Sequence, residues 1–167
     1  MQTYPTDGRP HAAREPHAAS HAPDATEPPG NRLDAEAAAV GDRPGAECLR
    51  LLVVDDAPDV TEMIALMMSY AGYQVKTAFS APEAFDAARG GHFDAVISDI
   101  GMPGMSGYEL AEALRALPAY ERTPLIAVTG FTMYDDRERA RAAGFNDFLT
   151  KPINPADLLD AVRRLCG

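Results

Sequence analysis

The sequence lacks the features that place a protein in a membrane or outside the cell. None of its apolar runs approaches the length of a membrane span, so we expect no membrane insertion. The N-terminus shows no basic region followed by an apolar core, and therefore no signal peptide is indicated. Cys48 and Cys166 are the only cysteines, too few for a disulfide framework. These absences favour a reduced, cytoplasmic setting.

Basic residues are also scarce. The chain has 15 Lys and Arg against 25 Asp and Glu, which gives a formal net charge of −10 at pH 7. Such an acidic protein is poorly suited to neutralise a phosphate backbone, so we expect no nucleic-acid partner. The length of 167 residues suits one ordinary domain with additional chain.

Large aliphatic residues are nearly absent from residues 1–47, which are rich in Ala, Pro, His and acids. Such a segment cannot bury enough apolar surface to offset the entropy of ordering it, so we expect a disordered N-terminal extension. His17 and His21 are four residues apart, a spacing that could bind a metal on a helix. Prolines on both sides of the pair favour a solvated tail instead.

From residue 48 onward, short apolar runs alternate with amphipathic stretches. Strands are predicted at about 49–54, 74–78, 94–98, 124–128 and 147–149. Helices are predicted at about 58–71, 80–89, 106–117, 132 or 135 to 143, and 154–165. Residues 80–83 (SAPE) and 106–109 (SGYE) match the capping box that opens a helix.

Five βα units in strict alternation predict an α/β domain over residues 48–167. Alternation implies a parallel sheet with helices on both faces, a doubly wound arrangement. For five units the natural topology is flavodoxin-like, with strand order 2-1-3-4-5 and a switch point between strands 1 and 3.

Polar residues stand where the predicted strands end. Asp55 and Asp56 follow the first strand, Asp99 the third, Thr129 the fourth and Lys151 the fifth. Taken singly, each has an ordinary explanation as a turn, cap or exposed residue. Because the carboxyl ends of parallel strands share one edge of the sheet, the set is expected to converge there.

This combination of groups predicts phosphoryl chemistry. Three adjacent carboxylates repel one another and need a cation, and oxygen ligands select Mg²⁺ or a similar ion. Lys151 adds an ammonium group and Thr129 adds a hydroxyl. A metal, a lysine and a hydroxyl around a carboxylate are the parts of phosphoryl transfer to an aspartate, and Asp99 is the best nucleophile candidate.

Four motifs together resemble the receiver domain of bacterial two-component response regulators. They are LLVVDD at 51–56, Asp99 with MPGMSG behind it, VTG at 128–130 and KP at 151–152. The resemblance covers about residues 49–166, and the LTKPINPADLL ending is most similar to receivers attached to hybrid sensor kinases. No kinase module precedes the domain and no output domain follows it, so we expect a stand-alone receiver.

The resemblance implies a site. Asp99 would accept a phosphoryl group from a histidine kinase or a histidine phosphotransfer protein. Asp56, Asp99 and the Gly101 carbonyl would hold Mg²⁺, with Asp55 helping through water. The domain would not be an enzyme beyond the phosphorylation and dephosphorylation of its own aspartate.

The resemblance also implies a switch. Thr129 would be the switch hydroxyl, Lys151 would pair with the phosphoryl group, and Phe148 would be the switch aromatic. The Lys151–Pro152 peptide bond would be cis. The charged helix after Thr129 would be the output face, with phosphorylation shifting a conformational population; a merely solvated face is the alternative.

Three positions depart from the family pattern. Ser106 replaces the aspartate that is usual in this loop, and as a helix cap it should serve equally well. Gly101 offers no side chain over the site, and Phe131 is bulky. In the family the last two positions influence the lifetime of the phosphoryl group, and the direction of the effect is open here.

Met63, Leu66 and Tyr70 form a second apolar stripe on the first helix, beside the one expected to face the core. The stripe would be partly core, or else a docking face for a helical bundle that bears the donor histidine.

Three functions are compatible with these residues. The first is a phosphorylation-switched signalling module with an unknown output protein. The second is a phosphoryl shuttle or sink in a multistep phosphorelay, which uses the same residues. The third is a Mg²⁺-dependent phosphohydrolase, which is disfavoured because Gly101 replaces the second acid of an Asp-x-Asp motif and because no Walker motif is present.

Overall fold

The computed structural model describes residues 48–130 and 134–167. The predictions for residues 1–47 and for Phe131 lie outside these ranges.

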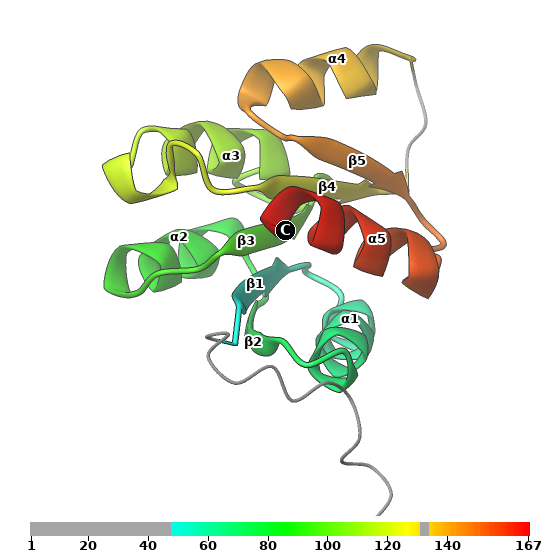
Figure 1. The fold of residues 1–167 in the computed structure, drawn as a ribbon. Helices are drawn as coiled ribbons and strands as arrows, with labels where there is room; N and C mark the ends of the chain where they lie inside the picture. Colours follow the sequence, from blue (N-terminus) through cyan, green and yellow to red (C-terminus); the bar gives the residue numbers. More distant parts are fainter. Residues whose placement is uncertain (1–47, 131–133) are drawn as a thin grey trace, which may run out of the picture. The chain divides into compact units, whose positions relative to one another are not determined.

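Strands and helices alternate along the described chain (Figure 1). The strands are β1 (Arg50–Val54), β2 (Gln74–Ala78), β3 (Ala95–Asp99), β4 (Leu125–Thr129) and β5 (Asp147–Thr150). The α-helices are α1 (Pro58–Tyr70), α2 (Ala81–Gly90), α3 (Gly107–Arg115), α4 (Tyr134–Ala143) and α5 (Pro155–Cys166). A short 3₁₀ helix, η1 (Pro118–Tyr120), lies between α3 and β4. Within the described part of the chain, no helix combines the length and the apolar character that a membrane crossing needs.

The predicted end of one helix is too late. α3 ends at Arg115 rather than near Leu117. Leu117 takes an extended conformation because Pro118 behind it disfavours helical geometry, and Pro118 then opens η1.

The five strands form one parallel sheet in the order β2-β1-β3-β4-β5, which confirms the predicted flavodoxin-like topology. The register between β1 and β3 pairs Val54 with Ser98. The residues that come next, Asp55 just after β1 and Asp99 at the end of β3, therefore lie side by side. Strand register, set by buried side chains, thus places two acids together.

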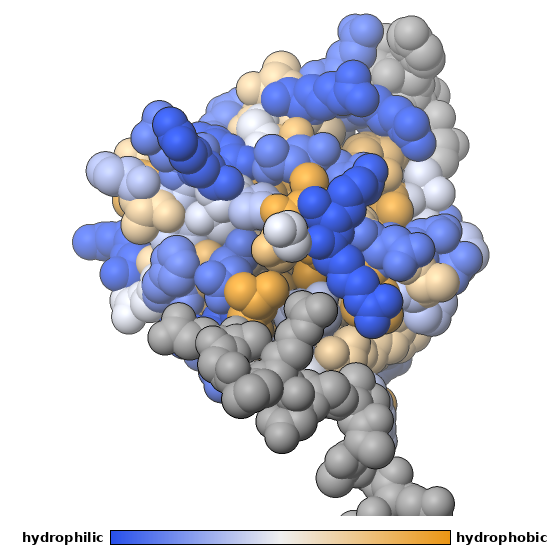
Figure 2. Space-filling view, viewed as in Figure 1, coloured by the Kyte–Doolittle hydropathy of each residue, from blue (hydrophilic) through white to orange (hydrophobic). Residues whose placement is uncertain are grey.

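Apolar side chains cover both faces of the sheet. Leu51, Val53 and Ile97 pack in one cluster with residues of α1 and α5. Leu52 and Val96 pack in another with residues of α2, α3 and α4. In Figure 1, α1 and α5 accordingly lie on one side of the sheet, and α2 and α3 on the other. Figure 2 shows that the outer surfaces of α4 and α5 are mostly hydrophilic.

The two predicted capping boxes have different outcomes. At α3 the box is complete: the Glu109 amide donates to the Ser106 hydroxyl, and the Ser106 amide donates to the Glu109 carboxylate. At α2, Ser80 accepts from the Glu83 amide, but the Glu83 carboxylate accepts from Phe79, one residue before the cap. The second box is therefore only half formed.

A partly buried arginine ties the end of α3 to two loops. The Arg115 guanidinium donates to the carbonyls of Tyr120 (2.6 Å), Thr123 (2.7 Å) and Gly144 (2.6 Å) and to the Asn146 side chain (2.8 Å). Burial lowers the pKa of Arg115. Carbonyl dipoles rather than a carboxylate surround this cation, and they join α3 to the start of β4 and to the turn before β5.

The start of α3 packs directly against the end of β3. A Cβ added at Gly107 would lie 2.2 Å from the Asp99 carbonyl oxygen and 2.7 Å from the Ile100 Cα. Both neighbours are backbone atoms and cannot move aside like a flexible side chain. Only glycine therefore lets α3 begin this close to Asp99.

Replacing Gly107 with alanine should lower the free energy of unfolding by about 2 kcal/mol or more, because backbone must shift to relieve the overlap. Gly90→Ala is the control, since a Cβ there meets nothing within 4 Å. We expect it to leave the stability within about 0.5 kcal/mol of the wild type. Urea unfolding followed by circular dichroism measures both. Equal stability of the two variants would contradict the close approach.

Candidate functional site

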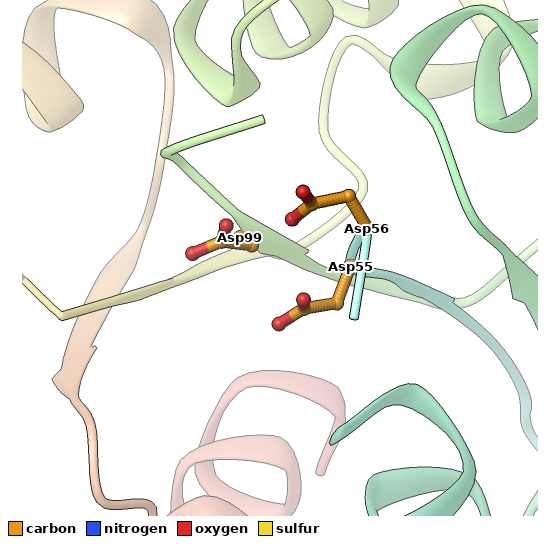
Figure 3. A group of neighbouring side chains, drawn as sticks. All are labelled: Asp55, Asp56 and Asp99. Carbon is orange, nitrogen blue, oxygen red and sulfur yellow. The ribbon is translucent and has the colours of Figure 1, made fainter. Parts of the chain in front are cut away.

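Three carboxyl groups gather where β1 and β3 end. Asp55 and Asp56 follow β1, and Asp99 is the last residue of β3. One carboxylate oxygen of each lies within 4.8 Å of those of the other two. Asp55 and Asp99 are buried and Asp56 is exposed. Figure 3 shows the three side chains projecting toward the same side of the sheet edge.

Lys151 brings a positive charge into this group from the end of β5. Its ammonium Nζ lies 2.7 Å from Asp55 Oδ2 and 3.3 Å from Asp99 Oδ1. The Lys151 amide also donates to the Thr129 carbonyl at 2.7 Å, so backbone pairing with β4 continues up to the site. The Lys151–Pro152 bond is cis, as the family resemblance implies.

Both oxygens of Asp55 are already engaged. Oδ1 accepts a hydrogen bond of 2.9 Å from the Ala57 amide, and Oδ2 accepts from Lys151. Ala57 is the residue that caps α1, and it has no side-chain acceptor of its own. Because both Asp55 oxygens already accept hydrogen bonds from the protein, Asp55 is better suited to contact a metal through water than to bind it directly.

The charges of the site shift the pKa values of two members. Burial raises the pKa of Asp99, Lys151 opposes this, and the neighbouring Asp55 adds to it. For Lys151, burial lowers the pKa, but the hydrogen bond and charge of Asp55 and the charge of Asp99 outweigh it, and the net direction is upward. Lys151 pairs with Asp55 and Asp99, so its single positive charge is outnumbered by the three carboxyl groups of the site.

The donor set fits a hard divalent cation. Carboxylate oxygens on a partly open edge are the ligands of Mg²⁺, which retains several waters. Asp56 is exposed, so it is accessible to such an ion.

The remaining predicted residues lie around this group. The Gly101 backbone amide is close enough to the Asp99 carboxyl group to lower its pKa, against the larger effect of burial. Thr129 is buried at the end of β4 and lines a groove together with Gly101. Phe148 is half-buried on β5, packs against the core, and has the Arg137 guanidinium 5.3 Å from its ring centroid.

A family model for the response regulator receiver domain matches residues 51–163. The chain belongs to the response regulator receiver domain family. Phosphoryl-accepting signalling in two-component systems is the function of this family, so the chain is a signalling domain.

Three curated relatives are similar to this receiver. An uncharacterized 14.6 kDa protein of Leptolyngbya boryana is 39% identical over 70% of this chain and 88% of its own length. The transcriptional regulatory protein TcrA of Mycobacterium tuberculosis is 34% identical over 75% of this chain. The virulence sensor protein BvgS of Bordetella pertussis is 43% identical over 70% of this chain. The receiver spans 51% of TcrA and 10% of BvgS.

Solved structures agree with the fold. The Vibrio cholerae chemotaxis protein CheY4 has a TM-score of 0.69 and 34% identity, covering 71% of this chain and 99% of its own. The receiver domain of the sensor histidine kinase PA1611 of Pseudomonas aeruginosa has a TM-score of 0.68 and 31% identity, covering 72% of this chain and 99% of its own. That second structure holds a magnesium ion in its active-site cleft.

The second apolar stripe of α1 lies on the surface. Met63, Leu66 and Tyr70 are 44%, 59% and 79% exposed. The neighbouring Ile64 and Met68 are buried and supply the core contact of the helix. The stripe is thus exposed and not part of the core.

Some residues that hold the fold together, at the site or away from it, carry no sequence signal. Thr61 is fully buried and hydrogen-bonds to the Asp55 carbonyl, yet a lone threonine among apolar residues resembles a core filler. Arg115 looks like an ordinary surface charge of a helix end. Their roles depend on residues that only the folded chain brings near.

The raised pKa of Asp99 predicts that Asp99→Asn stabilises the metal-free protein at pH 7. The folded state holds the Asp99 proton more tightly than the unfolded state does, so wild-type stability falls as the pH rises from 3.8 through the folded pKa. Asp99→Asn should therefore show its full gain in stability at pH values above the folded pKa of Asp99, and no gain at pH values below 3.8. Thermal unfolding in a chelator at several pH values measures this, with the exposed Asp86→Asn as control. A variant less stable than the wild type at pH 7 would contradict the prediction.

Proposed function

We propose that Asp99 is the phosphorylated residue of this receiver, and that a histidine kinase or a histidine phosphotransfer protein is the donor. The supporting observation is the Lys151 ammonium group, which lies between Asp55 and Asp99 at a shared edge of three carboxyl groups. A carboxylate held beside a fixed cation is suited to receive a group that carries negative charge.

The transfer forms one bond and breaks another. A carboxylate oxygen of Asp99 attacks phosphorus, the bond from phosphorus to the donor imidazole nitrogen breaks, and the imidazole leaves. Lys151, 3.3 Å from Asp99 Oδ1, stabilises charge on the phosphoryl oxygens. Positioning and charge stabilisation are the main contributions that this reaction needs.

Asp56, Asp99 and the Gly101 carbonyl would hold the Mg²⁺ ion, with Asp55 acting through water. When bound, the ion neutralises charge that develops on the phosphoryl group. Asp55 fits its indirect role because Ala57 and Lys151 occupy its two oxygens.

The proposed switch consists of Thr129 and Phe148. Phosphorylation would draw the Thr129 hydroxyl toward the site and favour a repacked Phe148, which shifts a population between two states. A groove between α4 and β5 is lined by Phe148 together with Arg137 and Arg141. We infer that this groove belongs to the output face, where repacking would be read by the output protein.

Residues 48–167 would be the receiver unit, and residues 1–47 an extension of it. Both cysteines are free thiols, which supports a cytoplasmic location. The exposed stripe of Met63, Leu66 and Tyr70 would be the docking face for the helical bundle of the donor.

A phosphoryl shuttle is the second candidate. Its supporting observation is the 43% identity to a segment of the sensor protein BvgS. In that case the group on Asp99 would move on to a second histidine protein, and no output contact would be needed.

Asp99→Asn should abolish phosphorylation, because an amide oxygen is a poor nucleophile and forms no stable acyl phosphate. The full chain is incubated with Mg²⁺ and a small phosphodonor, and intact mass is measured. Asp86→Asn makes the same charge change on an exposed position and should incorporate as much phosphate as the wild type. Equal incorporation by Asp99→Asn would sink the proposal.

The phosphorylated receiver distinguishes the two candidate functions. If the chain is a shuttle, mixing it with a histidine phosphotransfer protein should move the phosphoryl group to that protein within seconds to minutes. A phosphoryl group that stays on Asp99 while partner binding changes favours the signalling module.

Leu66→Asp should lower kcat/KM for transfer from a histidine kinase by about tenfold or more, as expected for a central apolar contact. Phosphorylation by the small phosphodonor needs no docking face and should be unchanged, which serves as the internal control. A loss in both reactions would instead indicate damage to the site or to the fold.

A further inference from the structure

Thr61 is a buried polar residue in the first turns of α1, with 0% of its surface exposed. Its hydroxyl oxygen lies 2.9 Å from the Asp55 carbonyl oxygen and 3.0 Å from the Ala57 carbonyl oxygen. The two contacts differ in kind. Ala57 is the residue four positions earlier, and such a bond is common for threonine in helices. Asp55 lies outside the helix, just after β1.

The Asp55 carbonyl belongs to the peptide group that joins Asp55 to Asp56. A bond to that oxygen restrains the orientation of the peptide, and hence the directions in which the two acidic side chains leave the backbone. Thr61 does not touch either carboxylate. It acts on the backbone that carries both.

Backbone hydrogen bonds also hold the turn between β1 and α1: the Asp55 amide donates to the Ala78 carbonyl, and the Thr61 amide donates to the Ala57 carbonyl. The N-cap residue Ala57 makes no side-chain cap bond. The Ala57 amide donates instead to Asp55 Oδ1, so the carboxylate of Asp55 closes the turn from one side. Thr61 closes it from the other side through the Asp55 carbonyl. Fully buried hydrogen bonds of this kind are costly to leave unmade.

We infer that Thr61 is a positioning residue for the acidic site. It holds the Asp55–Asp56 peptide in the orientation that directs both carboxylates toward the Mg²⁺ position. This inference rests on the proposed Mg²⁺ site. Residues that orient metal-ligating side chains without contacting the metal commonly change the metal affinity by tenfold or more when they are removed.

Thr123 provides a matched control elsewhere in the fold. It is also buried, and its hydroxyl donates to the carbonyl of Ala119, four residues earlier, at 3.3 Å. It lies near the start of β4, at the opposite edge of the sheet from the acids. Replacing either threonine with valine removes one buried hydroxyl and keeps the side-chain shape. The two variants differ in that only Thr61→Val loses a hydrogen bond to the Asp55 carbonyl.

The test measures Mg²⁺ affinity of the full chain by calorimetry or by amide shifts in NMR. Thr61→Val should bind Mg²⁺ about tenfold more weakly, while Thr61→Ser, which keeps the hydroxyl, should stay within about twofold of the wild type. Thr123→Val should bind as the wild type does. Thr61→Ala replaces the valine variant if valine does not fold.

A second readout needs no metal. Hydrogen exchange at the Ala57 amide, which donates to Asp55 Oδ1, should speed up in Thr61→Val and not in Thr123→Val. A folded Thr61→Val with unchanged Mg²⁺ affinity and unchanged exchange would overturn the inference, as would an equal loss of affinity in Thr123→Val. A wild type that binds no Mg²⁺ would refute the metal site, and the exchange result would still decide whether Thr61 holds the turn.

Discussion

The Lys151 ammonium group between Asp55 and Asp99 is the interaction that lets the acidic site exist. Two buried acids at adjacent strand ends would repel each other without it. The lysine arrives from β5, two strands away from β3 in the sheet, and only the parallel topology brings it there. One lysine does not balance three carboxyl groups, so the same arrangement suits a divalent cation, whose charge can in turn stabilise an incoming phosphoryl group.

Backbone packing around the site is as restrictive as its charges. The register of β1 with β3 sets Asp55 beside Asp99, and Gly107 lets α3 begin against the Asp99 carbonyl. Thr61 holds the turn on the other side of the acids. Small errors in any of these backbone segments would separate groups that must act together. A site built on strand ends is precise because the sheet behind it is rigid.

The sequence was sufficient for the topology and for the residues at the strand ends, because both follow from hydrophobic periodicity and from the parallel sheet. It was insufficient for contacts that need the folded chain. The Arg115 network joins α3 to Gly144 and Asn146, 29 and 31 residues away. The half-formed box at Ser80 depends on the position of the Phe79 amide, which no local motif reports. Exposure of the α1 stripe likewise depends on what packs nearby.

A crystal structure of the full chain with Mg²⁺ and beryllofluoride, a phosphoryl mimic, would show whether Asp99 is the phosphorylated residue. We expect the mimic on a carboxylate oxygen of Asp99, the metal on Asp56, Asp99 and the Gly101 carbonyl, and Lys151 in contact with a fluorine atom. A mimic bound to another acid, or a Lys151 that remains on Asp55 and Asp99 away from the mimic, would contradict it.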